Sequence, residues 1–197
     1  MRIFQSHIWC FSLLVSCAFL LSCQSPRQPS ANGRATPAQP PLGNTSLKLT
    51  SPAFNEGEMI PRKYTCAGEN VSPPLLWSGV PANTKSLALI VDDPDAPGKT
   101  WVHWVVYDLP PDLNSVPENF ASTDRLPGTA RQGTNDFQKI FYGGPCPPAG
   151  THRYNFRLYA LDRQSSLPNS GATKDQLVAV MQGHILAEGH LMGRYSH

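Results

Sequence analysis

The chain has 197 residues and a formal net charge of +2, and only 15% of its residues are Asp, Glu, Lys or Arg. It contains no basic stripe and no acidic block, which argues against binding to nucleic acid or to another polyanion. Twenty prolines and fifteen glycines, beside a single convincing helical pattern, favour a mostly β fold with many turns.

An apolar run, Ile8 to Leu21, follows a weakly basic start and ends just before Cys23. The run is too short for a comfortable permanent span of a membrane but is typical of an export signal. Its ending resembles a lipoprotein signal, which predicts a signal peptide over residues 1–22 and lipidation of Cys23. Plain secretion and an uncleaved anchor are the alternatives, and all three place the domain outside the cytoplasm, in the cell envelope.

The segment from Gln24 to Asn44 is rich in Ser, Pro, Gln and Ala and has almost nothing to bury. Because such a segment cannot offset its own ordering entropy, we expect residues 23–44 to form a flexible tether. The remaining residues, 45–197, suffice for one domain with one hydrophobic core.

Two of the five cysteines, Cys66 and Cys146, lie in the predicted domain, while the other three lie in the signal region. An exported protein meets an oxidising compartment, so this pair is a candidate disulfide. The bond would close a loop of about 80 residues and stabilise the fold by roughly 4 kcal/mol in the chain-entropy model. Two buried thiols are the other interpretation, because the sequence does not give the separation of the two side chains.

Three segments in the first half of the domain have strand patterns. Thr45–Thr50 alternates apolar and polar residues, as a half-buried strand does. Val71–Trp77 reads as extended, but Pro73 and Pro74 predict a position at an edge or a rim. Ser86–Asp92 is almost continuously apolar, which predicts a strand covered on both faces.

The next predicted strand, Trp101–Leu109, follows an acidic loop. Its alternation predicts that His103, Val105 and Tyr107 share one face. Because a hairpin joins it to the preceding strand, we expect His103 to lie beside Asp93 and the rest of the acidic loop.

A long connection, Pro110–Gly150, shows little regular pattern, and connections of this kind tend to be functional lids or rims. It ends in a loop rich in glycine and proline, Gly143–Gly150, which leads directly into the predicted strand His152–Leu161. A rigid loop that ends at a titratable side chain is suited to holding a small polar ligand.

The segment Thr173–Gln176 has the form of a capping box and predicts a helix that ends at Gly189. The apolar face of this helix would consist of Leu177, Val180, Met181, His184 and Ile185. His184 is therefore interpreted as a packing residue, and His190 and His197 as surface residues.

Ordered motifs are spread along the predicted domain from Leu47 to the C-terminus. They are Tyr64-Thr65-Cys66, Val71–Leu75, Asp93–Pro97, Trp101–Trp104 and Gly143–Tyr154. Together they closely resemble the phosphatidylethanolamine-binding protein family, in its bacterial Raf-kinase-inhibitor-like branch. The resemblance implies a β-sandwich, in which a large, mostly antiparallel sheet packs against a smaller sheet, with a C-terminal α-helix. It also implies a small anion-binding pocket built from Asp93, His103, Gly144, Pro145, His152 and Tyr154.

The implied pocket residues have the chemistry to hold an anion. The rings of His103 and His152 offer N–H donors and can become cationic near neutral pH beside an anion. The Tyr154 hydroxyl is a further donor, and the backbone N–H groups around Gly143 and Gly144 are expected to form an anion nest.

The acidic residues near the pocket need another role, because a carboxylate repels a phosphate. Asp93 is expected to accept a hydrogen bond from a histidine ring and so to orient it, with contact to the ammonium of an ethanolamine head group as the alternative. Asp95 and Arg153, on adjoining segments, are expected to form a structural ion pair behind the site.

One residue departs from the pattern of the family that the sequence resembles. Where bacterial relatives usually have Asn-Asp-Phe-Gly, this chain has Gln138 after Phe137. If this position requires a positive φ, glutamine costs about 1 kcal/mol there or forces another path. The departure concerns the rim of the implied pocket and not its floor.

The leading functional hypothesis is a binding protein for a phosphoryl or carboxylate head group, without catalysis, cofactor or metal. Contact with a membrane is expected through the lipid anchor only. Because some members of the family inhibit kinases or serine proteases, an inhibitor with such a partner is one alternative. A hydrolase or metal-dependent enzyme is another, but the sequence has no Gly-x-Ser-x-Gly elbow and no His-x-His or His-Glu-x-x-His spacing.

Overall fold

A computed structural model of the chain describes residues 46–120 and 126–196, all within the unit Pro41–His197. The predictions for the signal peptide (1–22), for Cys23, for the tether (23–44) and for His197 lie outside the described residues. Within the described ranges, no helix combines the length and the apolarity needed to cross a membrane.

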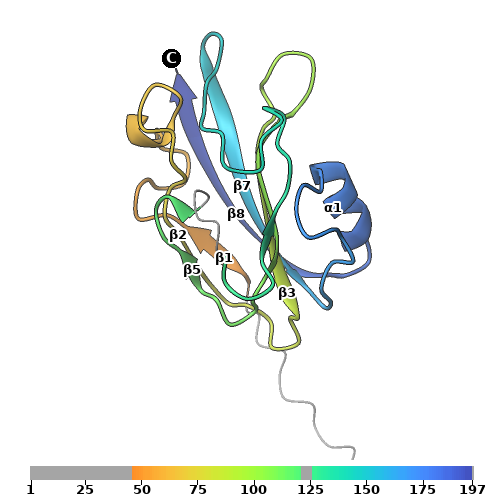
Figure 1. The fold of residues 1–197 in the computed structure, drawn as a ribbon. Helices are drawn as coiled ribbons and strands as arrows, with labels where there is room; N and C mark the ends of the chain where they lie inside the picture. Colours follow the sequence, from red (N-terminus) through yellow and green to blue (C-terminus); the bar gives the residue numbers. More distant parts are fainter. Residues whose placement is uncertain (1–45, 121–125, 197) are drawn as a thin grey trace, which may run out of the picture. The chain divides into compact units, whose positions relative to one another are not determined.

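A five-stranded antiparallel sheet with the order β6-β4-β3-β7-β8 forms the centre of the fold (Figure 1). Its strands are β3 (Ser86–Asp93), β4 (Trp101–Leu109), β6 (Arg131–Gln132), β7 (Thr151–Leu161) and β8 (Ile185–Ser196). Every residue of β3 is buried, as its continuous apolar run predicts. The patterns of β4 and β7 also led to strands at the predicted places.

A three-stranded sheet with the order β1-β2-β5 lies on one side of the large sheet. Its strands are β1 (Lys48–Thr50), β2 (Leu75–Ser78) and β5 (Ser115–Val116), and a short 3-10 helix, η1 (Arg62–Tyr64), precedes β2. Leu49 and Trp77 of the small sheet pack in one buried cluster with Leu89, Val106 and Phe156 of the large sheet. The protein is therefore the predicted β-sandwich.

The position of β2 differs from its prediction, because β2 is the central strand of the small sheet and not an edge strand. The two prolines that argued for an edge, Pro73 and Pro74, precede the first paired residue, Leu75. Their missing N–H groups therefore remove no hydrogen bond from the ladder.

A single helix, α1 (Lys174–Met181), covers the other face of the large sheet within the described residues (Figure 1). The predicted capping box is present, since the side chains of Thr173 and Gln176 each accept a hydrogen bond from the backbone N–H of the other. The helix ends at Met181 and not at Gly189, because Gly183 has a φ of +76° and turns the chain back toward the sheet.

The residues predicted to continue this helix form β8 instead, a strand of twelve residues that pairs with β7 along its length. Long-range pairing of this kind overrides a local helical pattern, because it joins the whole segment to a strand that is already in the core. His184 is consequently not a packing residue, and its Nδ1 lies 2.9 Å from Asp162 Oδ1 near the surface. His190 is exposed, as predicted.

A β-bulge at His103 changes the predicted alternation of β4. Val91 pairs with Trp104, but the next residue of β3, Asp92, pairs with Val102, so His103 is the extra residue. The prediction that His103 shares a face with Val105 and Tyr107 is therefore wrong. Val102 joins those two residues in the core beneath α1, and the His103 ring contacts Tyr154 and Phe137 instead.

Candidate functional site

A cavity of about 230 Å³ opens at the end of the large sheet where β3 ends and β4 begins. The bulge on β4 re-aims His103 into its wall, and the last residue of β3, Asp93, forms another part of the wall. The lining residues are Asp93, Ala96, Pro97, Trp101, His103, Phe137, Cys146 and Pro148. The hairpin thus brings Asp93 and His103 together.

The His103 ring is held by its Nδ1 atom, which lies 2.6 Å from the carbonyl oxygen of Gly143. A carbonyl only accepts hydrogen bonds, so Nδ1 carries the proton and Nε2 is the ring nitrogen that remains for a ligand. Burial lowers the pKa of His103 below its ordinary value, so the unliganded ring is neutral at pH 7. The side chain is 2% exposed, with the rings of Phe137 and Tyr154 against it at 5.4 and 5.2 Å.

Asp93 and His152 form a buried pair beside the cavity. Asp93 Oδ2 accepts a hydrogen bond from His152 Nδ1 at 2.7 Å, and Oδ1 accepts one from the backbone N–H of Asp95 at 2.8 Å. Both oxygens of the carboxylate are therefore occupied, and the His152 ring is fixed with its Nε2 atom directed away from Asp93. This is the histidine-orienting contact expected for Asp93.

The hydroxyl of Tyr154 is buried and has no hydrogen-bond partner among the described residues. Burial, and after it the nearby Asp93 carboxylate, raises the pKa of Tyr154, so the phenol keeps its proton and remains a donor. The Asp93 carboxylate and the backbone of Cys146, which belong to residues of the cavity lining, lie close enough to influence its pKa as hydrogen-bonding groups. Neither has the distance and angles of an ordinary hydrogen bond to the hydroxyl, so the geometry leaves it without a full partner. An unsatisfied buried hydroxyl costs about 1–3 kcal/mol, which a ligand acceptor would recover.

The backbone amides of the glycine-rich loop do not form the expected anion nest, so that prediction is wrong. The N–H of Gly143 donates to the His103 carbonyl at 2.9 Å, and the N–H of Gly144 donates to Asn70 Oδ1 at 2.7 Å. Glycine is required here for close packing, because a Cβ on Gly144 would lie 2.6 Å from the Tyr64 carbonyl oxygen. The loop supplies a wall, and its donors are already used.

A disulfide joins Cys66 to Cys146, with an S–S distance of 2.05 Å and a Cα–Cα distance of 5.5 Å. The backbone N–H of Cys66 also donates to the Pro145 carbonyl at 3.1 Å, so Pro145 is held in the same contact. Because Cys146 lines the cavity, the bond anchors one pocket wall to the segment after η1. Gly144 and Pro145 do not line the cavity. Their hydrogen bonds to Asn70 and Cys66 fix the loop that positions Cys146 in its wall.

The two residues expected to support the site form an ion pair outside the cavity. Arg153 Nη2 and Nε lie 2.6 and 2.8 Å from the two carboxylate oxygens of Asp95. The hydrogen bonds from Arg153 hold the pKa of Asp95 at about 2. Neither residue lines the cavity, and their pairing ties the loop after β3 to the start of β7.

Comparison with known proteins identifies the family. The family model described as phosphatidylethanolamine-binding protein matches residues 50–196. The chain belongs to the phosphatidylethanolamine-binding protein family. An UPF0098 protein of Methanothermobacter thermautotrophicus is 52% identical to it over 149 residues, which are 76% of this chain and 98% of that protein.

Two solved structures extend this comparison to the fold of the family. The crystal structure of CT736, a phosphatidylethanolamine-binding protein homologue from Chlamydia trachomatis, matches with a TM-score of 0.71 and 44% identity, over 78% of this chain and 99% of that chain. E. coli YbcL, described as a member of the mammalian family, matches with a TM-score of 0.73 and 33% identity, over 77% and 99%. Each match spans 99% of the other chain, so this domain corresponds to nearly the whole of both solved chains.

Sequence reasoning missed the residue that holds the pocket rim of this family member, Asn135. Its Oδ1 accepts hydrogen bonds from the N–H groups of Phe137 and Lys139, each at 3.0 Å. Its Nδ2 donates to the carbonyl of Phe141 at 2.7 Å and to that of His103 at 3.2 Å. The Asn-Asp-Phe sequence in the long loop was a signal for a turn, but its partner strand was not visible in the sequence.

The departure from the family pattern at Gln138 lies in the same rim. Gln138 has a φ of +60°, which is the left-handed conformation that glycine adopts without strain. The position therefore requires a positive φ, and glutamine adopts it at the expected cost of about 1 kcal/mol. The chain does not take another path at this turn. Trp101 and Phe137, the aromatic residues of the rim, were likewise not predicted as site residues.

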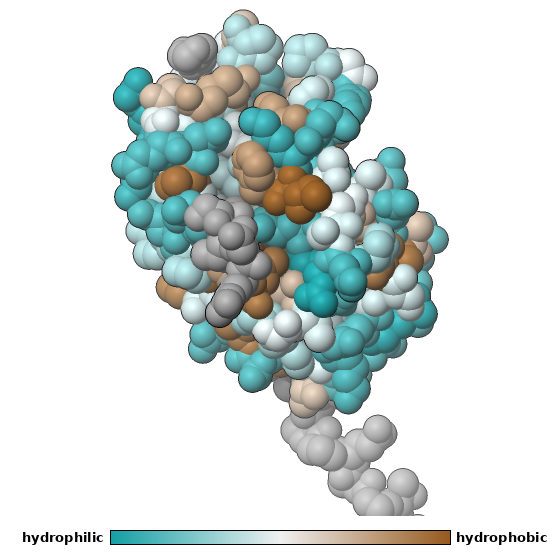
Figure 2. Space-filling model, in the orientation of Figure 1, coloured by the Kyte–Doolittle hydropathy of each residue, from teal (hydrophilic) through white to brown (hydrophobic). Residues whose placement is uncertain are grey.

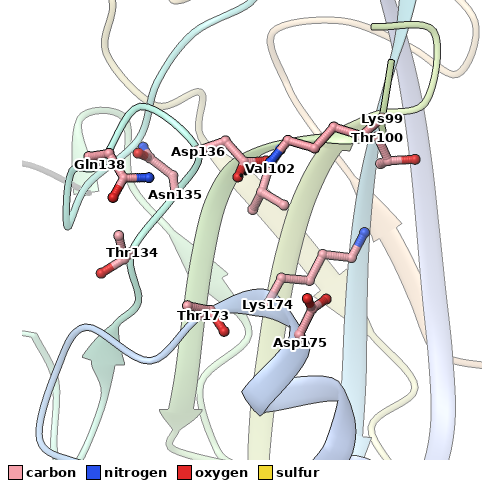
Figure 3. Close-up of a pocket in the computed structure, with 10 residues that line it drawn as sticks. All are labelled: Lys99, Thr100, Val102, Thr134, Asn135, Asp136, Gln138, Thr173, Lys174 and Asp175. Atoms are coloured by element: carbon pink, nitrogen blue, oxygen red, sulfur yellow. Dashed lines mark hydrogen bonds and ion pairs between the residues drawn. The ribbon is translucent and has the colours of Figure 1, made fainter. Parts of the chain in front are cut away.

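A second, polar cavity of about 440 Å³ lies on the other side of this rim segment, between it and the start of α1 (Figure 3). Its lysines are already paired: Lys99 Nζ lies 2.7 Å from Asp136 Oδ1, and Lys174 Nζ contacts the buried Asp92 carboxylate. Asp136 Oδ2 also accepts from the backbone N–H of Val102 at 2.7 Å. The smaller cavity, whose wall contains His103 and Asp93, is therefore the better candidate site. Tyr154 and His152 do not line it themselves, but they contact His103 and Asp93 directly behind its wall.

Within residues 46–120 and 126–196, no group of three or more His, Cys, Asp or Glu side chains is arranged to hold a metal ion. The cavity wall combines aromatic, proline and histidine side chains, which suits an organic head group.

Proposed function

We propose that this protein binds a small phosphoryl or carboxylate head group in the cavity beside Asp93 and His103. The observation that carries the proposal is the buried Tyr154 hydroxyl, which has no hydrogen-bond partner of ordinary geometry among the described residues. It lies next to His103, whose Nε2 remains for a ligand. Both features are costly in the empty pocket, and an anionic oxygen would satisfy both.

The proposed binding mode assigns the anion to Tyr154, His103 and His152. Tyr154 donates its phenolic proton, and the neutral His103 ring takes up a proton when the anion arrives and then donates from Nε2. The Asp93–His152 hydrogen bond orients the second ring. The aromatic rings of Trp101 and Phe137 offer faces to a cationic end such as an ammonium group.

Family membership supports a phospholipid head group as the ligand class, because the family description names phosphatidylethanolamine. Its head group combines a phosphoryl group with an ammonium group. The phosphoryl group suits the donors of Tyr154, His103 and His152, and the ammonium group suits the aromatic wall. We propose binding without turnover. The one cysteine in the cavity lining is held in a disulfide, and the lining contains no serine or threonine nucleophile.

We further propose that the protein is exported and anchored by a lipid on Cys23, with residues 23–44 as a tether. The lipoprotein-like end of the apolar run and the Cys66–Cys146 disulfide, a bond typical of oxidising compartments, support this location. Mass spectrometry of the N-terminal peptide from the membrane fraction would identify the modified cysteine. A Cys23→Ser variant that stays in the membrane fraction with an unmodified N-terminus would contradict the anchor.

The test of the pocket is an NMR titration with O-phosphorylethanolamine that follows the imidazole signals of His103 and His152. Both rings should shift in one saturable transition, while the exposed His190 should not respond. His103→Ala and His152→Ala should weaken binding to a similar degree. No response of either ring at millimolar ligand would remove the pocket assignment, and acetate and phosphate as competitors would separate carboxylate from phosphoryl preference.

A further inference from the structure

The exposed apolar side chains of the protein are clustered beside the pocket. Among the described residues, seven large hydrophobic side chains are at least 36% exposed, and three of them lie in one short segment: Phe137, Ile140 and Phe141. The other four are scattered over the domain. Figure 2 shows one face of the molecule, where hydrophobic surface occurs as separate patches among hydrophilic surface. Three such residues within five positions are therefore unusual for this protein.

The segment cannot relieve this exposure by folding inward, because hydrogen bonds fix its shape. Asn135 holds the N–H groups of Phe137 and Lys139 and the carbonyl of Phe141. The N–H of Asn135 in turn donates to the Lys139 carbonyl at 2.9 Å. The apolar side chains are thus presented on a rigid turn, which lowers the entropy cost of a docking contact.

The same segment forms the mouth of the head-group cavity. Phe137 lines that cavity and contacts the Trp101 ring at 5.5 Å. Together with Phe141 it also lines a neighbouring cavity of about 90 Å³ that reaches Gly144. A surface that covers Phe137 would therefore lie beside the entrance to the proposed binding site.

Two lysines flank the apolar side chains and pair with their aromatic rings. Lys99 Nζ lies 5.2 Å from the centroid of the Trp101 ring, and Lys139 Nζ lies 5.4 Å from the centroid of the Phe141 ring. Aromatic rings with long cationic side chains beside them are the composition found at the head-group level of a bilayer, where the ammonium reaches the phosphates and the ring lies deeper. The same composition is less suited to the core of a protein interface, where lysine is depleted.

We propose that this docking rim, formed by Trp101, Phe137, Ile140 and Phe141 with Lys139, inserts into the head-group layer of a phospholipid bilayer. Lys99, which is already paired with Asp136, is not counted as a contact to phosphate. The cavity would then receive the head group of a lipid that stays in the membrane. The identity of the head group rests on the proposed function, but insertion of the rim does not. This contact is additional to the anchor expected at Cys23, whose tether of about 22 residues would span about 25 Å and keep the domain near the bilayer.

The first test measures binding of the domain (residues 45–197) to vesicles of phosphatidylcholine, with and without phosphatidylglycerol. The chain offers a matched pair of variants, because Ile140 and Ile185 are both 45% exposed. Ile140→Ser should weaken vesicle binding about tenfold, and Ile185→Ser should leave it unchanged. Lys139→Gln should weaken binding to the anionic vesicles about fivefold more than binding to the neutral ones.

The second test locates the inserted surface in the full chain on lipid nanodiscs that contain a spin-labelled lipid. The methyl signal of Ile140 should broaden strongly, while that of Ile185 should not. Equal vesicle binding by Ile140→Ser and Ile185→Ser, or stronger broadening at Ile185, would overturn the proposal in favour of the anchor alone. Loss of vesicle binding in both variants would indicate non-specific hydrophobic adsorption of the domain and would also overturn the proposal.

A third measurement tests the head-group pocket and the docking rim independently of each other. It is the titration of the Ile140→Ser variant with O-phosphorylethanolamine. If His103 responds as in the parent protein while vesicle binding is lost, both proposals stand. If the rim docks but His103 never responds to the ligand, docking stands and the pocket assignment falls. Normal ligand binding with no difference between the Ile140 and Ile185 variants on vesicles would leave a soluble head-group binder and remove the docking rim.

Discussion

Replacing Tyr154 by phenylalanine tests the central feature of the proposed site, a buried hydroxyl that has no partner among the described residues. Removing an unsatisfied buried hydroxyl takes away a desolvation penalty of about 1–3 kcal/mol, so Tyr154→Phe should raise the free energy of unfolding of the empty protein by about 1 kcal/mol. The same change removes a hydrogen bond to an anion, worth about 1.5–3 kcal/mol, so affinity for O-phosphorylethanolamine should fall about 10- to 100-fold.

The control for this prediction is another buried tyrosine of the same region, Tyr142, whose hydroxyl donates to the Tyr64 carbonyl at 3.0 Å. Tyr142→Phe leaves a buried carbonyl without its donor, so it should lower the free energy of unfolding by about 1–2 kcal/mol and leave ligand affinity unchanged. Urea denaturation of the empty proteins and calorimetric titration supply the two quantities. A Tyr154→Phe protein that is less stable than the parent and binds the ligand normally would refute the reasoning, because its hydroxyl would then have an internal partner.

Four further predictions concern protonation, backbone strain and the disulfide. Because burial lowers the pKa of His103 below 6.5, its contribution to stability is complete above pH 6.5 and is lost as pH falls through the folded value; His103→Gln should flatten this part of a pH–stability curve. Anion binding should take up a proton at His103 near pH 7, which buffers of different ionisation enthalpy would reveal in calorimetry. Gln138→Gly should raise the free energy of unfolding by about 1 kcal/mol by relieving the positive φ, and unchanged stability would mean that the turn is not strained. Removing the bond between Cys66 and Cys146 by a double serine substitution should cost roughly 4 kcal/mol and also weaken ligand binding, because Cys146 lines the cavity.

Local patterns in the sequence were sufficient for the elements whose shape is decided locally. The continuous apolar run of β3, the alternation of β7 and the capping box at Thr173 all led to elements at the predicted places. In each case the deciding interaction lies within a few residues along the chain, or follows from burial on one face or both. The candidate pocket also followed from chain order, because a short hairpin has to bring Asp93 next to His103.

The predictions that failed depend on partners far along the chain. The extra residue at His103 is visible only in the pairing of β4 with β3, so alternation alone gave it the wrong face. The local pattern predicted a helix as far as Gly189, but pairing with β7 makes Ile185–Ser196 the strand β8. The amide of Gly144 was assigned to a ligand because its acceptor, Asn70, lies 74 residues away. A sequence shows which hydrogen-bond donors a loop contains, but it does not show which of them are already bonded within the protein.

Three features of the proposed site that lack a full set of contacts lie together at the end of the large sheet where β3 ends. The Tyr154 hydroxyl has no partner among the described residues, His103 is kept neutral by burial, and the docking rim holds exposed aromatic and aliphatic side chains on a rigid turn. Each feature costs stability, whereas the lysines of the polar cavity beside them are paired. A phosphate oxygen would satisfy the first two features, and only a ligand with an apolar surface around its head group would satisfy the third. A phospholipid in a bilayer has both parts, which is why a membrane lipid accounts for this end of the molecule better than a soluble anion.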